Sequence, residues 1–209
     1  PLVCVGHREF EGRGLGGVPG VFSAAEHLRA GQFFGQGVTM LNKQQILDLL
    51  AVLNDELQTR GVVGEIGLCG GAVMCLVFNA RESTRDVDAI FAPTGIIRDA
   101  AKSIAQKKGL PDDWLNDAAK GFFSDVPARN LFREWSNLRV WVPPADFMLA
   151  MKCVAARYDT TDADDVRFLV RHLGLTTATQ VVDAVAKYYP HERIPAKTQF
   201  FIEEIMQTS

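Results

Sequence analysis

The stretch LCGGAVMCLVFNARESTRDVDAIF, residues 68–91, decides how this chain folds and where its chemistry is expected. A glycine pair, Gly70 and Gly71, follows an apolar run, and a helix-like apolar segment comes next. An Arg/Ser/Thr/Arg cluster then leads to Asp86 and Asp88 in a short segment typical of a strand. The order strand, glycine turn, helix, strand predicts the beginning of an α/β sheet.

The two aspartates are the first candidate site. Asp86 and Asp88 lie two residues apart in a strand predicted over residues 86–91, so both carboxylates lie on one face. Neighbouring carboxylates repel each other unless a cation lies between them, and Mg²⁺ prefers oxygen ligands of this kind. The pair therefore predicts a site for Mg²⁺ (or Mn²⁺). The alternative is a solvated strand end without a ligand.

The glycine pair is the second candidate site. Gly70 and Gly71 lie at the predicted junction between a strand over residues 65–69 and a helix that ends near Asn79. Free backbone N–H groups at such a junction favour an anion, and glycine lets a phosphate approach the backbone closely. The alternative is a tight turn that only packs the helix on the sheet. The order of the two pairs is more specific than either pair, and it predicts a nucleoside triphosphate bound with its metal.

A polar cluster precedes the aspartates. Arg81, Ser83, Thr84 and Arg85 are able to cover phosphates or to fix the start of the strand through hydroxyl–backbone hydrogen bonds. For each arginine, a plain surface role is the alternative.

A second group of polar residues lies far downstream. Lys152 lies at the edge of the apolar stripe of a predicted helix, where it can reach a triphosphate or extend to solvent as a surface lysine. Arg157, Asp162 and Asp165 lie at the end of this helix and the beginning of the next. Asp162 is also able to act merely as an N-cap, with Asp165 in the favourable first turn.

The remaining pattern predicts an α/β (α+β) fold, in which helices pack on a small mixed sheet and the C-terminal half is helical. Residues 40–145 form the part with the sheet, the palm, and residues 146–209 the helical part. Beyond the opening stretch, strand formers predict one strand over residues 138–142. Apolar periodicity, caps and breakers predict helices over residues 43–60, 94–108, 114–120, 147–158, 162–174, 177–189 and 195–207.

Residues 1–39 differ from the rest of the chain. They contain nine glycines in mixed apolar and basic surroundings, without lasting helical or strand periodicity. We interpret them as an atypical Gly-rich leader, either translated upstream of the natural start or not native, with Met40 close to that start. A phosphate loop over residues 12–17 is the alternative, but the Lys-Ser/Thr that follows such a loop is missing.

Composition limits the class of protein. Apolar residues make up 47% and charged residues 22% of 209 residues, as in ordinary globular domains. The net charge of −3 predicts no global attraction to nucleic acid. Four cysteines without a CxxC pair favour buried free thiols, and no apolar run reaches the roughly 18 residues of a membrane span. A cytoplasmic protein without a membrane partner is the expectation.

Taken together, these residues resemble the nucleotidyltransferase superfamily with the DNA polymerase β-like palm. The likeness is greatest to the minimal nucleotidyltransferases of the DUF6036 and AbiEii-like toxin group, and it covers roughly residues 40–206. Gly70-Gly71 matches the phosphate-binding turn of the family, and Asp86 and Asp88 match its metal carboxylates. Three further segments are similar: DWLND at residues 113–117, PADFMLAMKCVAARYDTTDADDV at 144–166 and YYPHERIP at 188–195.

The resemblance implies a transferase that moves a nucleoside monophosphate from an NTP to a hydroxyl of tRNA or protein, and a toxin with an antitoxin partner. It implies catalytic roles for Asp86, Asp88, Lys152, Asp162 and Asp165. It implies nucleotide contacts from Gly70, Gly71, Arg81, Thr84, Arg85 and Arg157.

The chain also departs from the superfamily pattern. The usual turn is Gly-Ser rather than Gly-Gly, and the strand over residues 138–142 lacks the acidic residue that normally supplies a third metal carboxylate. This departure motivates a rival from another class, a catalytically decayed fold that binds nucleotide or a partner protein. A metal phosphohydrolase that uses the same aspartates is a third hypothesis.

Overall fold

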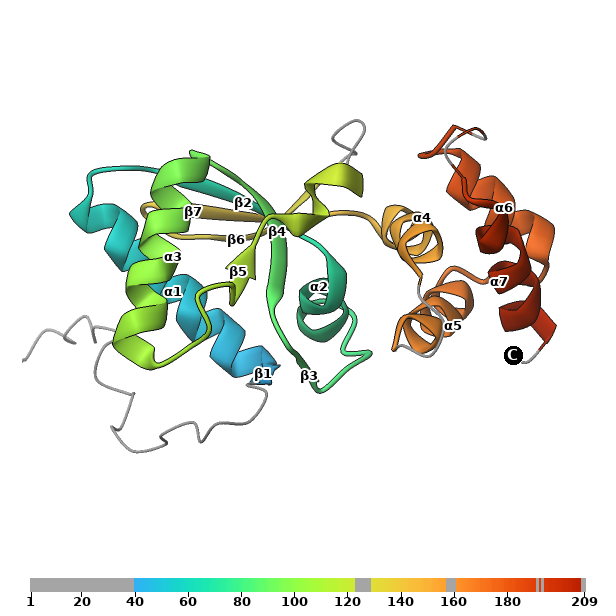
Figure 1. Cartoon of the computed structure of the whole chain (residues 1–209), viewed down its shortest axis with the longest axis horizontal. Coiled ribbons are helices and arrows are strands. Elements are labelled where there is room, and N and C mark those ends of the chain that lie inside the picture. The colour runs from blue at the N-terminus through green and yellow to red at the C-terminus, as the bar shows by residue number, and fades with distance from the viewer. Residues whose placement is uncertain (1–39, 123–128, 157–160, 191, 193, 208–209) are drawn as a thin grey trace, which may run out of the picture. The chain divides into compact units, whose positions relative to one another are not determined.

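The computed structural model describes residues 40–122, 129–156, 161–190, 192 and 194–207. Within these residues, seven α-helices combine with a five-stranded mixed sheet and a two-stranded sheet (Figure 1). This architecture confirms the predicted α+β class. The predicted leader over residues 1–39 lies outside the described residues.

The first helix begins and ends where its caps predict. Helix α1 (Lys43–Thr59) has Asn42 as its N-cap, and a capping box joins the side chains and backbones of Asn42 and Gln45 at 2.9 Å. Gly61 follows the helix with a positive φ of 66°. The apolar residues at helical spacing are all buried: Ile46, Leu49, Leu50, Leu53 and Leu57.

The five strands of the main sheet lie in the order β5-β4-β2-β7-β6. Strand β2 pairs antiparallel with β4 and parallel with β7, so the sheet is mixed. The strand bounds are β2 (Gly64–Leu68), β4 (Val87–Ala92), β5 (Leu115–Asn116), β6 (Asn130–Glu134) and β7 (Leu138–Val142). The separate two-stranded sheet joins β1 (Leu41–Asn42) to β3 (Ser83–Thr84).

One face of the main sheet packs on α1 and on α3 (Thr94–Lys108). At Gly64, a Cβ atom would lie 2.9 Å from Leu57 of α1 and 3.1 Å from Ile97 of α3. Along β4 the buried residues Val87, Ala89 and Phe91 alternate with half-buried ones, as the sequence predicts. Asp88 consequently lies on the opposite face, away from α1 and α3.

The C-terminal part consists of helices, as predicted. They are α4 (Ala145–Ala155), α5 (Asp162–His172), α6 (Ala178–Ala186) and α7 (Ala196–Gln207). Helix α6 begins with a capping box between Thr177 and Gln180. None of the helices in the described part of the chain is long and apolar enough to cross a membrane.

Five helix bounds differ from the prediction by two or three residues. Helix α5 ends at His172 rather than at Gly174, and α6 ends at Ala186 rather than at Tyr189. The helix after the glycine pair, α2 (Gly70–Leu76), ends three residues before Asn79, which has a positive φ of 50°. Helix α4 begins after Pro144 rather than after Asp146, and it ends at Ala155 rather than near Tyr158. Because proline disfavours helical conformation in the residue before it, the PPAD sequence lets the helix begin directly after the second proline.

The predicted helix over residues 114–120 is wrong. Residues 115 and 116 form strand β5, and a 3-10 helix, η2 (Ala118–Phe122), follows. The cause is Trp114, which is buried and whose Nε1 donates to the carbonyl of Ala101 at 3.0 Å. The carbonyl of Trp114 also accepts a hydrogen bond from the N–H of Val87 at 2.7 Å, and this contact holds the segment at the edge of the sheet.

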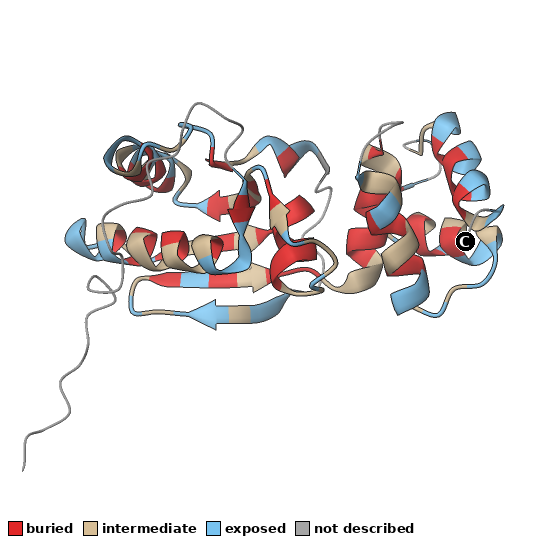
Figure 2. Ribbon diagram, turned by 90° about the horizontal axis from the view of Figure 1, so that it is seen from below, coloured by how far each residue is buried: buried red, intermediate tan, exposed pale blue. Residues whose placement is uncertain are grey.

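Strand β6 was not predicted. Four of its five residues are exposed, so it lacks the apolar alternation that marks a half-buried strand, and it is drawn mostly in pale blue in Figure 2. The short strands β1 and β3 escaped prediction because two residues carry no periodicity.

Candidate functional site

A pocket of about 470 Å³ brings together most of the predicted site residues. Three parts of the chain supply most of its lining: the glycine turn, the segment that leads into β4, and the facing ends of α4 and α5. The predicted residues among its lining are Gly71, Arg81, Ser83, Thr84, Arg85, Asp86, Asp88, Lys152 and Asp162. Met40, Glu82 and Thr161 complete the lining.

The carboxylates of Asp86 and Asp88 lie together on the palm side of this pocket. Asp86 directly precedes β4, Asp88 is its second residue, and both are half-buried. Burial raises the pKa of Asp86, and the charge of Asp113 raises it further. Burial also raises the pKa of Asp88, and the charge of Asp86 adds to this effect. The pair therefore carries negative charge that its surroundings leave only partly compensated.

The main hydrogen-bond donor to this pair is neutral. The side-chain Nδ2 of Asn116 in β5 donates to Asp86 Oδ2 at 3.2 Å, and hydrogen bonding from Asn116 lowers the pKa of both aspartates. The sequence did not single out Asn116, because residues 114–120 were predicted to be helical. The only signal for Asn116 in the sequence was its position in the DWLND segment, residues 113–117, which resembles the superfamily.

The glycine pair packs directly against the polar side chains of the site. Gly70 has a positive φ of 59°, and a Cβ atom there would overlap the carboxylate of Asp88. A Cβ atom at Gly71 would overlap the hydroxyl of Thr84 and lie 3.3 Å from Nη1 of Arg81. This is the packing role that the sequence left open. A phosphate contact from the two amides stays a prediction.

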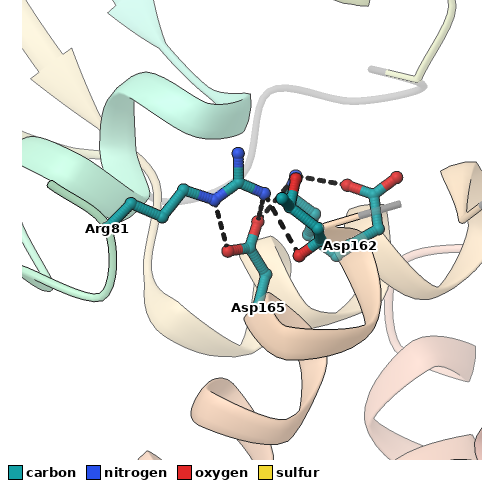
Figure 3. Close-up of polar contacts among 5 residues, drawn as sticks. Arg81, Asp162 and Asp165 are labelled. Atoms are coloured by element: carbon teal, nitrogen blue, oxygen red, sulfur yellow. Dashed lines mark hydrogen bonds and ion pairs between the residues drawn. The ribbon is translucent and has the colours of Figure 1, made fainter. Parts of the chain in front are cut away.

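An ion network joins the palm to the helical part. The guanidinium of Arg81 donates from Nε to Asp165 Oδ1 at 2.6 Å and from Nη2 to Asp165 Oδ2 (Figure 3). Arg81 Nη2 also donates to the carbonyl of Thr161 at 3.3 Å. Lys152 Nζ lies 2.7 Å from Asp162 Oδ1 and 2.9 Å from Asp165 Oδ2. Two cations and two carboxylates thus form one balanced cluster.

The charged side chains of this network differ in how far they are buried. The side chain of Lys152 is only 8% exposed, so the surface-lysine alternative is wrong. The side chain of Asp165 is 2% exposed and contacts both cations, whereas Asp162 is 21% exposed and contacts Lys152. Asp165 is therefore the deeply buried partner that the two cations share, and Asp162 is the more exposed of the two carboxylates beside Lys152.

Of the two remaining predicted arginines, the structure describes Arg85. Arg85 is exposed at the pocket, where its charge lowers the pKa of Asp86 against the effects of burial and Asp113. Arg157 lies outside the described residues, and so does Cys4.

The other three cysteines are free and buried, as predicted. Cys69 lies next to the glycine pair, and burial raises the pKa of its thiol. Burial raises the pKa of Cys153 to about 12. Both residues stay protonated near neutral pH and so lack the thiolate that a cysteine nucleophile needs.

The residues present fit a divalent cation that is shared with a phosphate ligand. Among the described residues, no group of three or more His, Cys, Asp or Glu side chains is arranged to hold a metal. Mg²⁺ is commonly held by one or two carboxylates together with substrate phosphates, rather than by an all-protein cage. Asp86 and Asp88 match this arrangement, because both line the pocket and neither has a cationic hydrogen-bond partner among the described contacts.

Comparisons of the chain with protein-family models, with curated proteins and with solved structures found no match. The functional assignment therefore rests on the chemistry of the pocket and on the resemblance of its motifs.

Proposed function

We propose that this protein is a metal-dependent nucleotidyltransferase, which transfers a nucleoside monophosphate from an NTP to an acceptor hydroxyl. The observation that carries the proposal is the pocket in which the Asp86 and Asp88 carboxylates lie near Lys152. One wall supplies negative charge that its surroundings compensate only partly, and the other supplies a buried cation paired with Asp162 and Asp165. A metal–triphosphate complex has charges that complement both walls.

In this proposal Asp86 and Asp88 hold Mg²⁺ or Mn²⁺ against the triphosphate. When bound, the cation neutralises charge that develops on the phosphate oxygens. Lys152 contacts a phosphate oxygen once the ligand has displaced Asp162, and the amides of Gly70 and Gly71 donate to the same triphosphate. Asp165 keeps Lys152 and Arg81 in place. Thr84 and Arg85 contact the nucleotide from the pocket wall, and Arg157 is assigned to it by the resemblance alone.

The acceptor hydroxyl attacks the α-phosphorus, the bond from that phosphorus to the β-phosphate breaks, and pyrophosphate leaves. The hydroxyl proton is released to water. The residues act by positioning and by charge neutralisation rather than by forming a covalent intermediate. From the resemblance, we propose tRNA or protein as acceptor, a cytoplasmic site of action and an antitoxin protein as partner.

The direct test is transfer of label. The purified full chain is incubated with each α-labelled NTP, Mg²⁺ or Mn²⁺, and either total RNA or cell lysate. We expect one acceptor class to become labelled and pyrophosphate to be released. The double variant Asp86→Asn/Asp88→Asn should lose the label, while Asp99→Asn, an exposed aspartate of α3, should retain it.

The other outcomes separate the rival functions. Absence of label together with an unchanged double variant contradicts the transferase. Calorimetric binding of NTP without turnover supports the binding module instead. Release of free phosphate in place of pyrophosphate supports the phosphohydrolase.

A further inference from the structure

Asn116 lies directly beside the aspartate pair. Strand β5 pairs parallel with β4, and the register places Asn116 opposite Asp88 and Leu115 opposite Val87. Leu115 and Val87 are both buried, whereas Asn116 and Asp88 are both half-buried. Residues paired in register on neighbouring strands point to the same face of a sheet. The amide of Asn116 therefore lies on the face that carries the carboxylates.

Hydrogen bonds set which end of this amide faces the pair. Oδ1 of Asn116 accepts from the N–H of Ala118 at 3.0 Å. Nδ2 consequently points away from Ala118, and it donates to Asp86 Oδ2 at 3.2 Å and lies 3.5 Å from the carbonyl of Asp113. Because Oδ1 accepts from the backbone N–H of Ala118 and Nδ2 faces Asp86, the side chain offers the aspartates a donor.

The backbone on both sides of Asn116 is anchored. On one side, Trp114 is buried and bonded to Ala101 of α3 and to Val87 of β4. On the other side, the carboxylate of Asp117 forms ion pairs with Arg98 at 2.8 Å and with Lys120 at 3.1 Å. Asn116 is therefore held at a fixed position, unlike an asparagine in a solvated turn.

A neutral donor suits this position better than a charged one. An arginine or lysine at residue 116 would neutralise the carboxylates and compete with a cation for them. An amide N–H holds one oxygen of Asp86 and leaves the net charge of the pair unchanged.

We propose that Asn116 is a positioning residue, which holds Asp86 beside Asp88 in the geometry that accepts a divalent cation. The inference rests on the metal site of the proposed function and adds a residue to it. Asn116 acts through Asp86 and does not itself contact the cation.

The test is Mn²⁺ binding by the full chain, measured without nucleotide by the electron paramagnetic resonance signal of free Mn²⁺. We expect Asn116→Ala to weaken Mn²⁺ binding by about ten-fold or more, as is usual when a residue that orients a ligand is removed. Asn130→Ala, on the exposed edge strand β6, should bind as the wild type does. Asp88→Asn should abolish binding at this site.

A second variant separates positioning from a purely structural role. Asn116→Asp keeps an oxygen for the N–H of Ala118 but turns an acceptor toward Asp86. We expect its metal-free melting temperature to fall and Mn²⁺ to raise that temperature more than in the wild type. If Asn116 only capped Ala118, Asn116→Asp would melt and bind Mn²⁺ as the wild type does.

The failures of the two proposals are distinguishable. Mn²⁺ affinity of Asn116→Ala within about two-fold of the wild type, together with lost binding in Asp88→Asn, overturns the role of Asn116 alone. If Asn116→Ala does not fold, an unchanged melting temperature of metal-free Asn116→Asp overturns that role. A wild type that does not bind Mn²⁺ without nucleotide overturns the inference alone, because the proposed function shares the cation with the triphosphate. An Asp88→Asn variant that binds Mn²⁺ fully overturns the inference and the metal site of the proposed function together.

Discussion

The two walls of the pocket treat charge in opposite ways. On the palm side, Asp86 and Asp88 lie together with a neutral amide as their main donor, and burial raises the pKa of both carboxyls. On the helical side, Lys152 of α4 and Arg81, which extends from the palm, each have a carboxylate partner within 3 Å, and the group of four charges is balanced. The difference indicates that the palm side carries negative charge that a cation would compensate, whereas the charges of the helical side already compensate one another.

This contrast assigns a separate task to each wall. The palm side gains stability when a cation binds, since binding relieves repulsion and compensates the cost of burial. On the helical side, an arriving phosphate must first exchange with a resident carboxylate. The predictions below alter one wall at a time, from the largest expected effect to the smallest.

Removal of the Asp165 charge should have the largest effect on stability. Asp165→Asn leaves Arg81 and Lys152 in a buried site without their shared carboxylate, at an expected cost of about 3 kcal/mol in the free energy of unfolding. Urea denaturation measures this cost. Asp164→Asn is the matched control on the same helix, because the side chain of Asp164 is 82% exposed. Equal unfolding midpoints for the two variants would show that the network is not a structural link.

A methyl group at Gly70 should disturb the palm side. Gly70→Ala places a Cβ atom against the carboxylate of Asp88. Gly109→Ala is the matched control, because Gly109 has a similar positive φ of 66° and open space around it. The overlap should make Gly70→Ala about 2 kcal/mol more destabilising than the control. Thermal unfolding of both variants gives the difference, and equal costs would contradict the close packing of the turn on Asp88.

The pH dependence of stability should reveal the negative charge of the palm side that is only partly compensated. Because the pKa of Asp88 is higher in the folded chain than in the unfolded chain, ionisation of this carboxyl favours unfolding. This cost is absent below the unfolded pKa of about 3.9, develops as the pH rises through the folded pKa, and persists above it. Asp88→Asn should therefore be more stable than the metal-free wild type at neutral pH and lose that advantage in acid.

Asp117 is the control for this titration, because its pKa is shifted in the direction opposite to that of Asp88. A hydrogen bond from Lys120 lowers its pKa, with a further contribution from Arg98, so its ionisation favours the folded state. Asp117→Asn should be less stable than the wild type at neutral pH, and the two should converge as the pH falls through the folded pKa. Parallel stability curves for Asp88→Asn and the wild type would contradict the charge imbalance of the palm side.

Substitution of Asp162 should have the smallest effect. Asp162→Asn removes the more exposed carboxylate from Lys152 and a negative charge that raises the pKa of Asp88. We expect a nonhydrolysable NTP to bind about two- to five-fold more tightly to this variant in the presence of Mg²⁺, as measured by calorimetry. Asp164→Asn should leave the affinity unchanged. Weaker binding to Asp162→Asn would indicate that Asp162 supports the nucleotide rather than competing with it.

Much of the fold was predictable because its signals are local. The caps at Asn42 and Thr177, the alternation along β4 and the breaker Gly109 lie within a few residues of what they determine. Strands β5 and β6 were not predictable in this way. The first depends on where the Trp114 ring is buried, and the second is an exposed edge without alternation.

The candidate site likewise has one part that local sequence patterns predict and another part that they do not. The proximity of Gly70 to Asp88 follows from one short strand–helix–strand unit, and sequence patterns detect such units. The ion pair between Arg81 and Asp165 joins residues 84 positions apart, and it depends on how α5 packs near the glycine turn. No local sequence pattern encodes a contact between residues so far apart. The burial of Lys152 and the hydrogen bond from Asn116 to Asp86 also depend on contacts between distant segments, so only the structure reveals them.

The most direct measurement is a crystal structure of the full chain with Mn²⁺ and a nonhydrolysable NTP, with the manganese located by its anomalous signal. The account predicts manganese in contact with both Asp86 and Asp88, and a phosphate oxygen on Lys152 Nζ in place of Asp162 Oδ1. Manganese bound elsewhere, or a nucleotide outside this pocket, would contradict it.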